Sequence, residues 1–173
     1  MLVLPGAPAW SAFRLQRMLA RLQAVEPGIS GLQATLIHFI HCARPLDARE
    51  RSRLAQLLEV TDTGAARAAV PGLRLRLVVP RPGTISPWSS KATDIARVCG
   101  LEAILRIERG TAYELRLDAS AGAATVTALD AVLHDRMTEA VLGELSAAAV
   151  LFAESPPQAL RRSGRSCAPT TTP

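Results

Sequence analysis

Residues 73–79 alternate between leucine and arginine and end in two valines, and this pattern constrains the fold more than any other in the chain. Strict alternation predicts a strand of a β-sheet that is buried on one side only. A proline-rich loop, residues 80–87, follows it. After the loop we expect a helix that is capped by Ser89 or Ser90, continues through Cys99 and has Gly100 as its C′ residue. The pattern therefore indicates a sheet with helices packed on it.

The segments before this strand carry comparable signals. Residues 2–4 are a short apolar run ended by a Pro-Gly pair, which predicts a strand. Apolar residues recur at helical spacing in residues 11–25, so a helix is expected there, with Ser11 as its cap. Residues 29–43 are rich in β-branched and apolar residues and predict a second strand. Asp47 then caps a second helix, whose apolar residues are Leu54, Leu57 and Leu58.

Two further strands and a long helix are expected in the second half. Residues 103–109 and 111–118 predict two strands that form a tight hairpin at Gly110, with Tyr113, Leu115 and Leu117 on one face. Residues 126–149 predict a last helix. Its inward-facing residues are expected to be Leu129, Leu133, Met137, Ala140 and Val141.

The predicted order is βαβα followed by βαββα, which indicates an α+β fold with a mostly antiparallel sheet backed by helices. The two halves suggest rough structural repeats, although no sequence repeat is evident. Apolar residues make up 49% of the 173 residues and aromatics 3%, so Leu, Val, Ile and Ala must fill the core of one domain. We assign that domain to residues 1–153. Residues 154–173 lack apolar periodicity and are expected to be a disordered tail.

Charge and cysteine usage narrow the class of protein. The net charge is +5, but arginines are interleaved with acidic residues over most of the chain, so we expect no nucleic-acid partner. Three widely spaced cysteines form neither a CxxC pair nor a disulfide framework, which indicates a cytosolic setting. Neither a signal peptide nor a membrane-spanning run is evident. The chain is expected to be soluble and cytoplasmic.

The loop at residues 80–90 is the strongest candidate for chemistry. Its X-Pro units and Gly83 specify an unusual backbone. A helix start at Ser89 and Ser90, with Lys91 beside it, could hold a phosphate or carboxylate on free backbone N–H groups. The alternative is an ordinary capped helix behind a structural loop.

Residues 80–96 read PRPGTISPWSSKATDIA, and four shorter segments accompany this run. They are residues 8–14 (PAWSAFR), 97–101 (RVCGL), 106–110 (RIERG) with Tyr113, and 133–137 (LHDRM). In this order the set resembles the N-terminal domain of large, single-chain phosphoribosylformylglycinamidine synthase, over roughly residues 6–153.

The resemblance implies a fold like a fused pair of the small accessory subunits found where that enzyme is split into separate chains. It also implies a role in the ATP- and glutamine-dependent amidation of formylglycinamide ribonucleotide in purine biosynthesis. In the long family members a synthetase region binds ATP, Mg²⁺ and the ribonucleotide, and a glutaminase region uses a Cys nucleophile. The N-terminal domain packs on both regions and is thought to help form the ammonia path. The residues expected at the domain interface or a binding site are Arg81, Thr84, Ser86, Trp88, Ser89, Ser90, Lys91, Thr93 and Asp94.

Catalytic residues, metal ligands and a cofactor are not expected in this chain itself. A GxxxxGK[ST] loop is absent from the sequence. Cys42 and Cys99 are expected to be buried as small apolar residues. His38 and His41 are three apart on a strand and so face opposite sides, which disfavours a shared metal. Residues 134–136 are expected on the surface of the last helix, with a contact to the synthetase region as the alternative.

Two functions from different classes remain open. The first is an N-terminal scaffold domain of the synthase, in a truncated or frame-shifted form without an active site. The second is a stand-alone α+β binding module that holds a phosphate or nucleotide at Ser89–Lys91. An independent enzyme has no motif to support it.

Overall fold

The computed structural model describes residues 1–60, 72–117 and 123–153. They form the predicted α+β fold, an open sheet of strand order β1-β2-β4-β3-β5 in which all neighbouring strands are antiparallel. The elements are β1 (Leu2–Pro8), α1 (Ala12–Gln23), β2 (Ile29–Cys42), α2 (Ala48–Leu57), β3 (Leu73–Pro80), α3 (Pro87–Val98), β4 (Ile104–Leu117), α4 (Ala123–Leu133), β5 (Glu139–Leu142) and the 3₁₀ helix η1 (Ser146–Phe152). The predicted disordered tail lies outside the described residues.

The topology contains the same βαβα order twice. β2 and β4 are the two central strands, and their register extends from Ile29↔Leu117 to Cys42↔Ile104. β1 flanks β2 and β3 flanks β4 in the same antiparallel sense. The suggested repeat is therefore present in the arrangement of the elements, with β5 as an addition to the second half.

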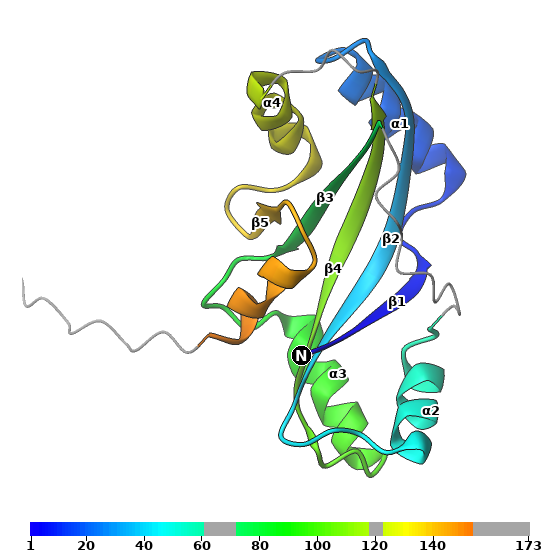
Figure 1. The fold of residues 1–173 in the computed structure, drawn as a ribbon, viewed down its shortest axis with the longest axis vertical. Helices are drawn as coiled ribbons and strands as arrows, with labels where there is room; N and C mark the ends of the chain where they lie inside the picture. Colours follow the sequence, from blue (N-terminus) through cyan, green and yellow to red (C-terminus); the bar gives the residue numbers. More distant parts are fainter. Residues whose placement is uncertain (61–71, 118–122, 154–173) are drawn as a thin grey trace, which may run out of the picture.

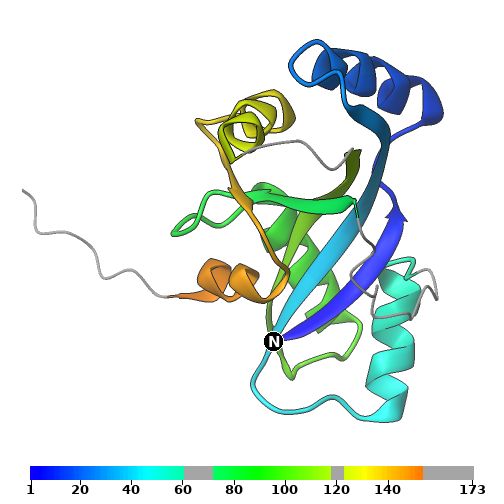
Figure 2. The ribbon, with the colours of Figure 1, turned by 45° about the horizontal axis from the view of Figure 1, so that its top comes forward.

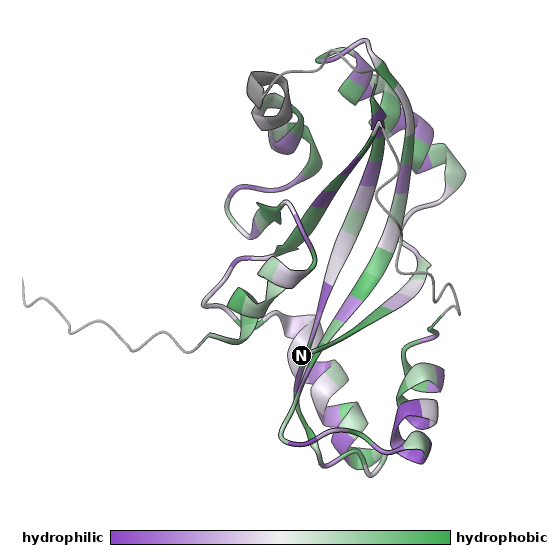
Figure 3. Ribbon diagram, viewed as in Figure 1, coloured by the Kyte–Doolittle hydropathy of each residue, from purple (hydrophilic) through white to green (hydrophobic). Residues whose placement is uncertain are grey.

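The two faces of the sheet are covered differently, as Figures 1 and 2 show. On one face, which we call the four-helix face, α1 and α4 cover one end and α2 and α3 the other. The opposite face, which we call the η1 face, packs Phe39, Leu77 and Val79 against Ala148 and Leu151 of η1. Figure 3 shows β5 as hydrophobic, which fits its place beside this cluster.

β4 is one continuous strand of 14 residues, so the predicted hairpin at Gly110 is wrong. Gly110 pairs with Ile37 in the middle of the sheet. A Cβ atom at Gly110 would lie 2.8 Å from the Val78 carbonyl oxygen and 3.0 Å from Val79 Cγ1. The glycine thus provides room for β3 rather than a turn. Tyr113, Leu115 and Leu117 do share one face, as predicted.

The predicted helix over residues 126–149 is also wrong, because it divides into α4, β5 and η1. Asp135 ends the helical path: its carboxylate accepts a hydrogen bond from Met137 N (2.8 Å), and its carbonyl oxygen accepts one from Glu139 N (2.8 Å). Residues 134–136 consequently lie in a turn and not on a helix. Leu129 and Leu133 are buried as expected, whereas Met137 is 76% exposed.

Strand β1 continues to Pro8 and does not end at the Pro-Gly pair. It pairs on one side only, with β2, and its register shifts between Pro5 and Pro8. An edge strand tolerates proline because the missing N–H is not needed for pairing. The pair therefore marks a local irregularity and not a boundary.

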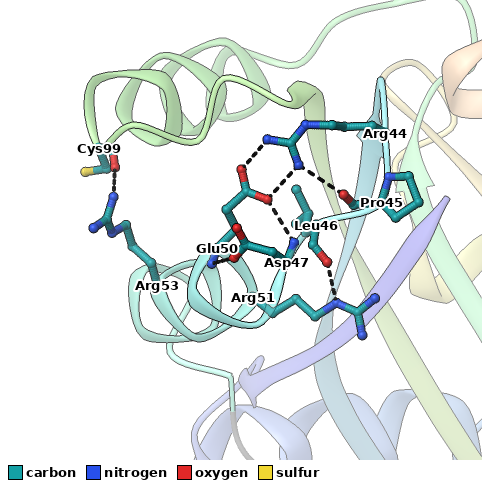
Figure 4. Close-up of polar contacts among 8 residues, drawn as sticks. All are labelled: Arg44, Pro45, Leu46, Asp47, Glu50, Arg51, Arg53 and Cys99. Carbon is teal, nitrogen blue, oxygen red and sulfur yellow. Dashed lines mark hydrogen bonds and ion pairs between the residues drawn. The ribbon is translucent and has the colours of Figure 1, made fainter.

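Helix α2 begins as predicted, at the cap residue Asp47 (Figure 4). The Asp47 carboxylate accepts a hydrogen bond from Glu50 N (2.8 Å), and Glu50 Oε2 accepts one from Asp47 N (2.9 Å). Arg44 pairs with the same Glu50 carboxylate at 2.7 Å. Arg53 donates to the Cys99 carbonyl oxygen (2.8 Å), which holds α2 beside the end of α3.

Candidate functional site

The proline-rich loop at residues 80–87, which we call the motif loop, and helix α3 complete an edge of the sheet. β3 pairs with β4 only as far as Val78↔Thr111, so the earlier part of β4 has no strand on that side. Polar groups of the motif loop and α3 form hydrogen bonds with this part of β4 instead. Thr93 Oγ1 accepts a hydrogen bond from Ile107 N (3.0 Å), and Arg106 Nη2 donates to the Thr84 carbonyl oxygen (2.7 Å).

Helix α3 begins earlier than the sequence predicted. Its N-cap is Ser86, not Ser89 or Ser90: Ser86 Oγ accepts a hydrogen bond from Ser89 N (3.0 Å), and Pro87 occupies the first helical turn. This arrangement is favourable because proline has no N–H to leave unsatisfied there. Ser89 is then fully buried, and Ser90 is exposed. The helix ends as predicted, with Gly100 at φ 77°.

A buried carboxylate lies beside this helix start. Glu108, on β4, is fully buried and accepts hydrogen bonds from Ser86 Oγ (3.1 Å) and Arg106 Nε (3.0 Å). Arg106 also forms an ion pair with it. The Ser86 hydroxyl therefore links the cap of α3 to β4. An external anion at this helix start would lie close to the Glu108 carboxylate.

On the four-helix face, Trp88 covers two residues that pair across strands β2 and β4. His38 and Arg109 are direct cross-strand partners. The His38 ring stacks on Trp88 with centroids 5.7 Å apart, and the Arg109 guanidinium carbon lies 4.4 Å from the Trp88 ring centroid. His41 contacts Phe152 on the η1 face, which confirms that the two histidines face opposite sides.

Several polar groups around Trp88 lack hydrogen-bond or ion-pair partners among the described residues. Burial, and next the Arg109 charge, lower the pKa of His38 to about 4, so its imidazole is neutral at pH 7. His38 Nδ1 and Ser89 Oγ are buried without a hydrogen-bond partner among the described residues. Within the same residues the Arg109 side chain forms no ion pair or hydrogen bond, and its burial lowers its pKa.

Trp88 also lines a groove between α2 and α3. The groove has a volume of about 220 Å³, and its walls are mainly apolar, with Leu54, Leu57, Ile95 and Ile107 among them. Lys91 lies on its rim, exposed to solvent. The Arg53 hydrogen bond joins α2 to the end of α3, the two helices that line this groove.

The residues that the sequence predicted for the site differ in their contacts and in their exposure to solvent. Thr84 and Ser86 contact β4 through the bonds above, and Arg81 N donates to the Thr138 carbonyl oxygen (2.9 Å). Ser89 and Thr93 are buried and Trp88 is partly buried. The exposed members are Arg81, Thr84, Ser90, Lys91 and Asp94.

Sequence reasoning did not single out His38, Arg106, Glu108 or Arg109 as site residues. The segment 106–110 contributed to the family resemblance, but the predicted hairpin at Gly110 concealed how it sits in the sheet. The alternation of charged and apolar residues over 106–108 was the available signal for Arg106 and Glu108, since two charges on one face of a buried strand require partners.

Other chemistry has little support in the part of the chain that the structure describes. There, no group of three or more His, Cys, Asp or Glu residues is placed to hold a metal ion. Cys42 and Cys99 are partly and not fully buried, which corrects the expectation for both. None of the described helices is both long and apolar enough to cross a bilayer.

One known protein family matches the part of the chain that contains the motif loop, α3 and β4. The model described as formylglycinamide ribonucleotide amidotransferase N-terminal matches residues 35–152, which is more than half of the 173 residues. The matched range extends from within β2 to the end of η1 and includes the motif loop, α3 and β4. The chain belongs to the family of N-terminal domains of formylglycinamide ribonucleotide amidotransferase.

Proposed function

We propose that this chain is a scaffold domain that binds the synthetase and glutaminase regions of the enzyme and has no active site of its own. Family membership connects the chain with phosphoribosylformylglycinamidine synthase, the same amidotransferase, and so with purine biosynthesis. That the chain is a truncated form, and cytoplasmic, stays a prediction.

The way in which the motif uses its polar groups supports this proposal. Ser86, Thr93 and the Thr84 carbonyl group all bond to residues of β4, and none of these three residues is among those that line the groove between α2 and α3. The most extended family motif thus builds the fold at the edge of β4. Its exposed members are left on the surface, where a neighbouring region could contact them. This pattern fits an interaction domain better than a catalytic one.

ATP and Mg²⁺ belong in this proposal to the synthetase region. The residues of this chain do not suit them, because the sequence lacks a phosphate-binding GxxxxGK[ST] loop and the described residues lack a set of metal ligands. We therefore assign no step of the amidation to this chain.

The proposal is tested by copurification and by an activity assay. The full chain should copurify with an amidotransferase that has been expressed without its own N-terminal domain. Alone, with ATP, glutamine and formylglycinamide ribonucleotide, it should form no product. Turnover by the pure chain, free of host enzyme, would show that it has an active site.

The alternative, a phosphate- or nucleotide-binding module at Ser89–Lys91, has weaker support. The helix begins at Ser86, and Glu108 lies at its start. A carboxylate there disfavours a second anion by charge repulsion. Calorimetry with ATP and with inorganic phosphate would reveal such a module, and on the scaffold proposal neither should bind.

A further inference from the structure

Among the residues that the structure describes, Arg109 has no counter-ion. Its side chain is partly buried on the four-helix face, where the guanidinium carbon lies 4.4 Å from the Trp88 ring centroid and the neutral His38 is the cross-strand neighbour. Removing a charged group from water is unfavourable unless other charges or hydrogen bonds compensate it. The ring of Trp88 provides a cation–π contact, but a guanidinium carries five N–H donors, and a π face does not satisfy them.

The ion pairs formed by three acidic residues do not include Arg109. Glu108, the next residue along β4, points to the η1 side and pairs with Arg106. On the four-helix face, Asp130 pairs with Arg76. Glu50, at the start of α2, pairs with Arg44. Among the described residues, Arg109 therefore forms no ion pair.

The surroundings of Arg109 indicate what would compensate it. Trp88 connects the guanidinium to the apolar groove between α2 and α3, and Lys91 adds a second positive charge at the rim. The planar fork of an arginine matches a carboxylate with two parallel hydrogen bonds. A partner segment that carries an acidic residue close to an apolar residue would suit both features. Its acidic side chain would bind Arg109, and its apolar side chain would enter the groove.

We propose that Arg109, held against Trp88, is the anchor for a carboxylate of the synthetase region, whose neighbouring apolar side chain enters the α2–α3 groove. This inference rests on the proposed scaffold function and names the contact by which it acts. It commits to a protein segment, so a small free anion or a second copy of this chain would be the wrong occupant.

The test measures binding of the full chain to an amidotransferase that lacks its own N-terminal domain. Arg109→Gln should weaken binding at least about ten-fold, because the partner's carboxylate would be left buried and unpaired. Arg116→Gln, an exposed arginine on the same strand, should change affinity less than about two-fold. Arg109→Lys should lie between wild type and Arg109→Gln, because it keeps the charge and loses the planar fork.

The possible outcomes separate the two proposals. If the wild-type chain does not bind, the scaffold function itself fails. If the wild-type chain binds and Arg109→Gln binds equally well, only the anchor is wrong. The anchor is also wrong if Arg109→Gln fails to fold, since the guanidinium is proposed to be dispensable for the fold. An Arg109-dependent rise in melting temperature with inorganic phosphate, or an Arg109-dependent dimer in sedimentation, without partner binding would contradict it too.

Discussion

His38 is kept neutral by its surroundings. It is 3% exposed, is stacked on Trp88 and lies opposite Arg109. Gly6 of β1 leaves the room that the ring occupies, since a Cβ there would lie 2.6 Å from His38 Cε1. Protonation would place a second cation beside Arg109 in a site with no counter-ion among the described residues.

This arrangement predicts a pH dependence of stability. The unfolded chain protonates His38 near pH 6.5, but the folded chain does so only near pH 4. Stability is therefore intact above pH 6.5 and is lost as the pH falls from 6.5 to 4, by an amount on the order of 2–3 kcal/mol. Urea unfolding of His38→Phe should lack this loss. His41→Phe, an exposed residue on the other face, should retain it, and an unchanged profile in His38→Phe would contradict the prediction.

The cap of α3 gives a second residue-scale prediction. Ser86→Ala removes both the bond to Ser89 N and a donor to the buried Glu108, and should cost about 1–2 kcal/mol of unfolding free energy. Ser90→Ala, one of the caps suggested by the sequence, should cost less than about 0.5 kcal/mol because Ser90 is exposed. A larger cost at Ser90 in denaturant unfolding would place the cap where the sequence first suggested it.

At the scale of the element, the continuity of β4 depends on Gly110. Gly110→Ala should destabilise the chain by about 1–3 kcal/mol, because the new Cβ would meet the Val78 carbonyl oxygen at 2.8 Å. Gly31→Ala on β2 is the matched control, since its Cβ would lie 3.7 Å from the nearest atom, Arg116 Cβ. Equal melting temperatures for the two variants would mean that β3 does not approach β4 closely at Gly110.

The elements also show what the sequence could and could not predict. The Asp47 cap, the strand at β3 and the long apolar run of β2 are local signals, and the structure confirmed each of them. The predicted burial of β3 on one side only is wrong for its second half, where Leu77, Val78 and Val79 are all buried because the sheet is covered on both faces.

Gly110 was misread because its role depends on a distant partner: a glycine can serve a turn or a close contact, and only the neighbouring strand decides. At Asp135 the signal was local, since Met137 N and Glu139 N both bond to this residue, but the apolar spacing was followed instead. The sequence located the motif loop. The contacts of Ser86 with Glu108 and of Trp88 with Arg109 could not be predicted, because they arise only when α3 packs beside β4.

At the scale of the whole molecule, the fold joins two βαβα units through the central pair β2 and β4. The motif loop closes the edge of β4, and α2 and α3 form a groove that Trp88 and Lys91 border. The groove and the exposed residues of the motif are the surfaces that the scaffold proposal assigns to contact with the other regions of the enzyme.

The most direct test of the scaffold account is sedimentation velocity of this chain mixed with an amidotransferase that lacks its N-terminal domain. The account predicts one complex that contains a single copy of each chain, formed at micromolar concentrations and absent when either chain is measured alone. Two independently sedimenting species at those concentrations, with both chains folded by circular dichroism, would contradict it.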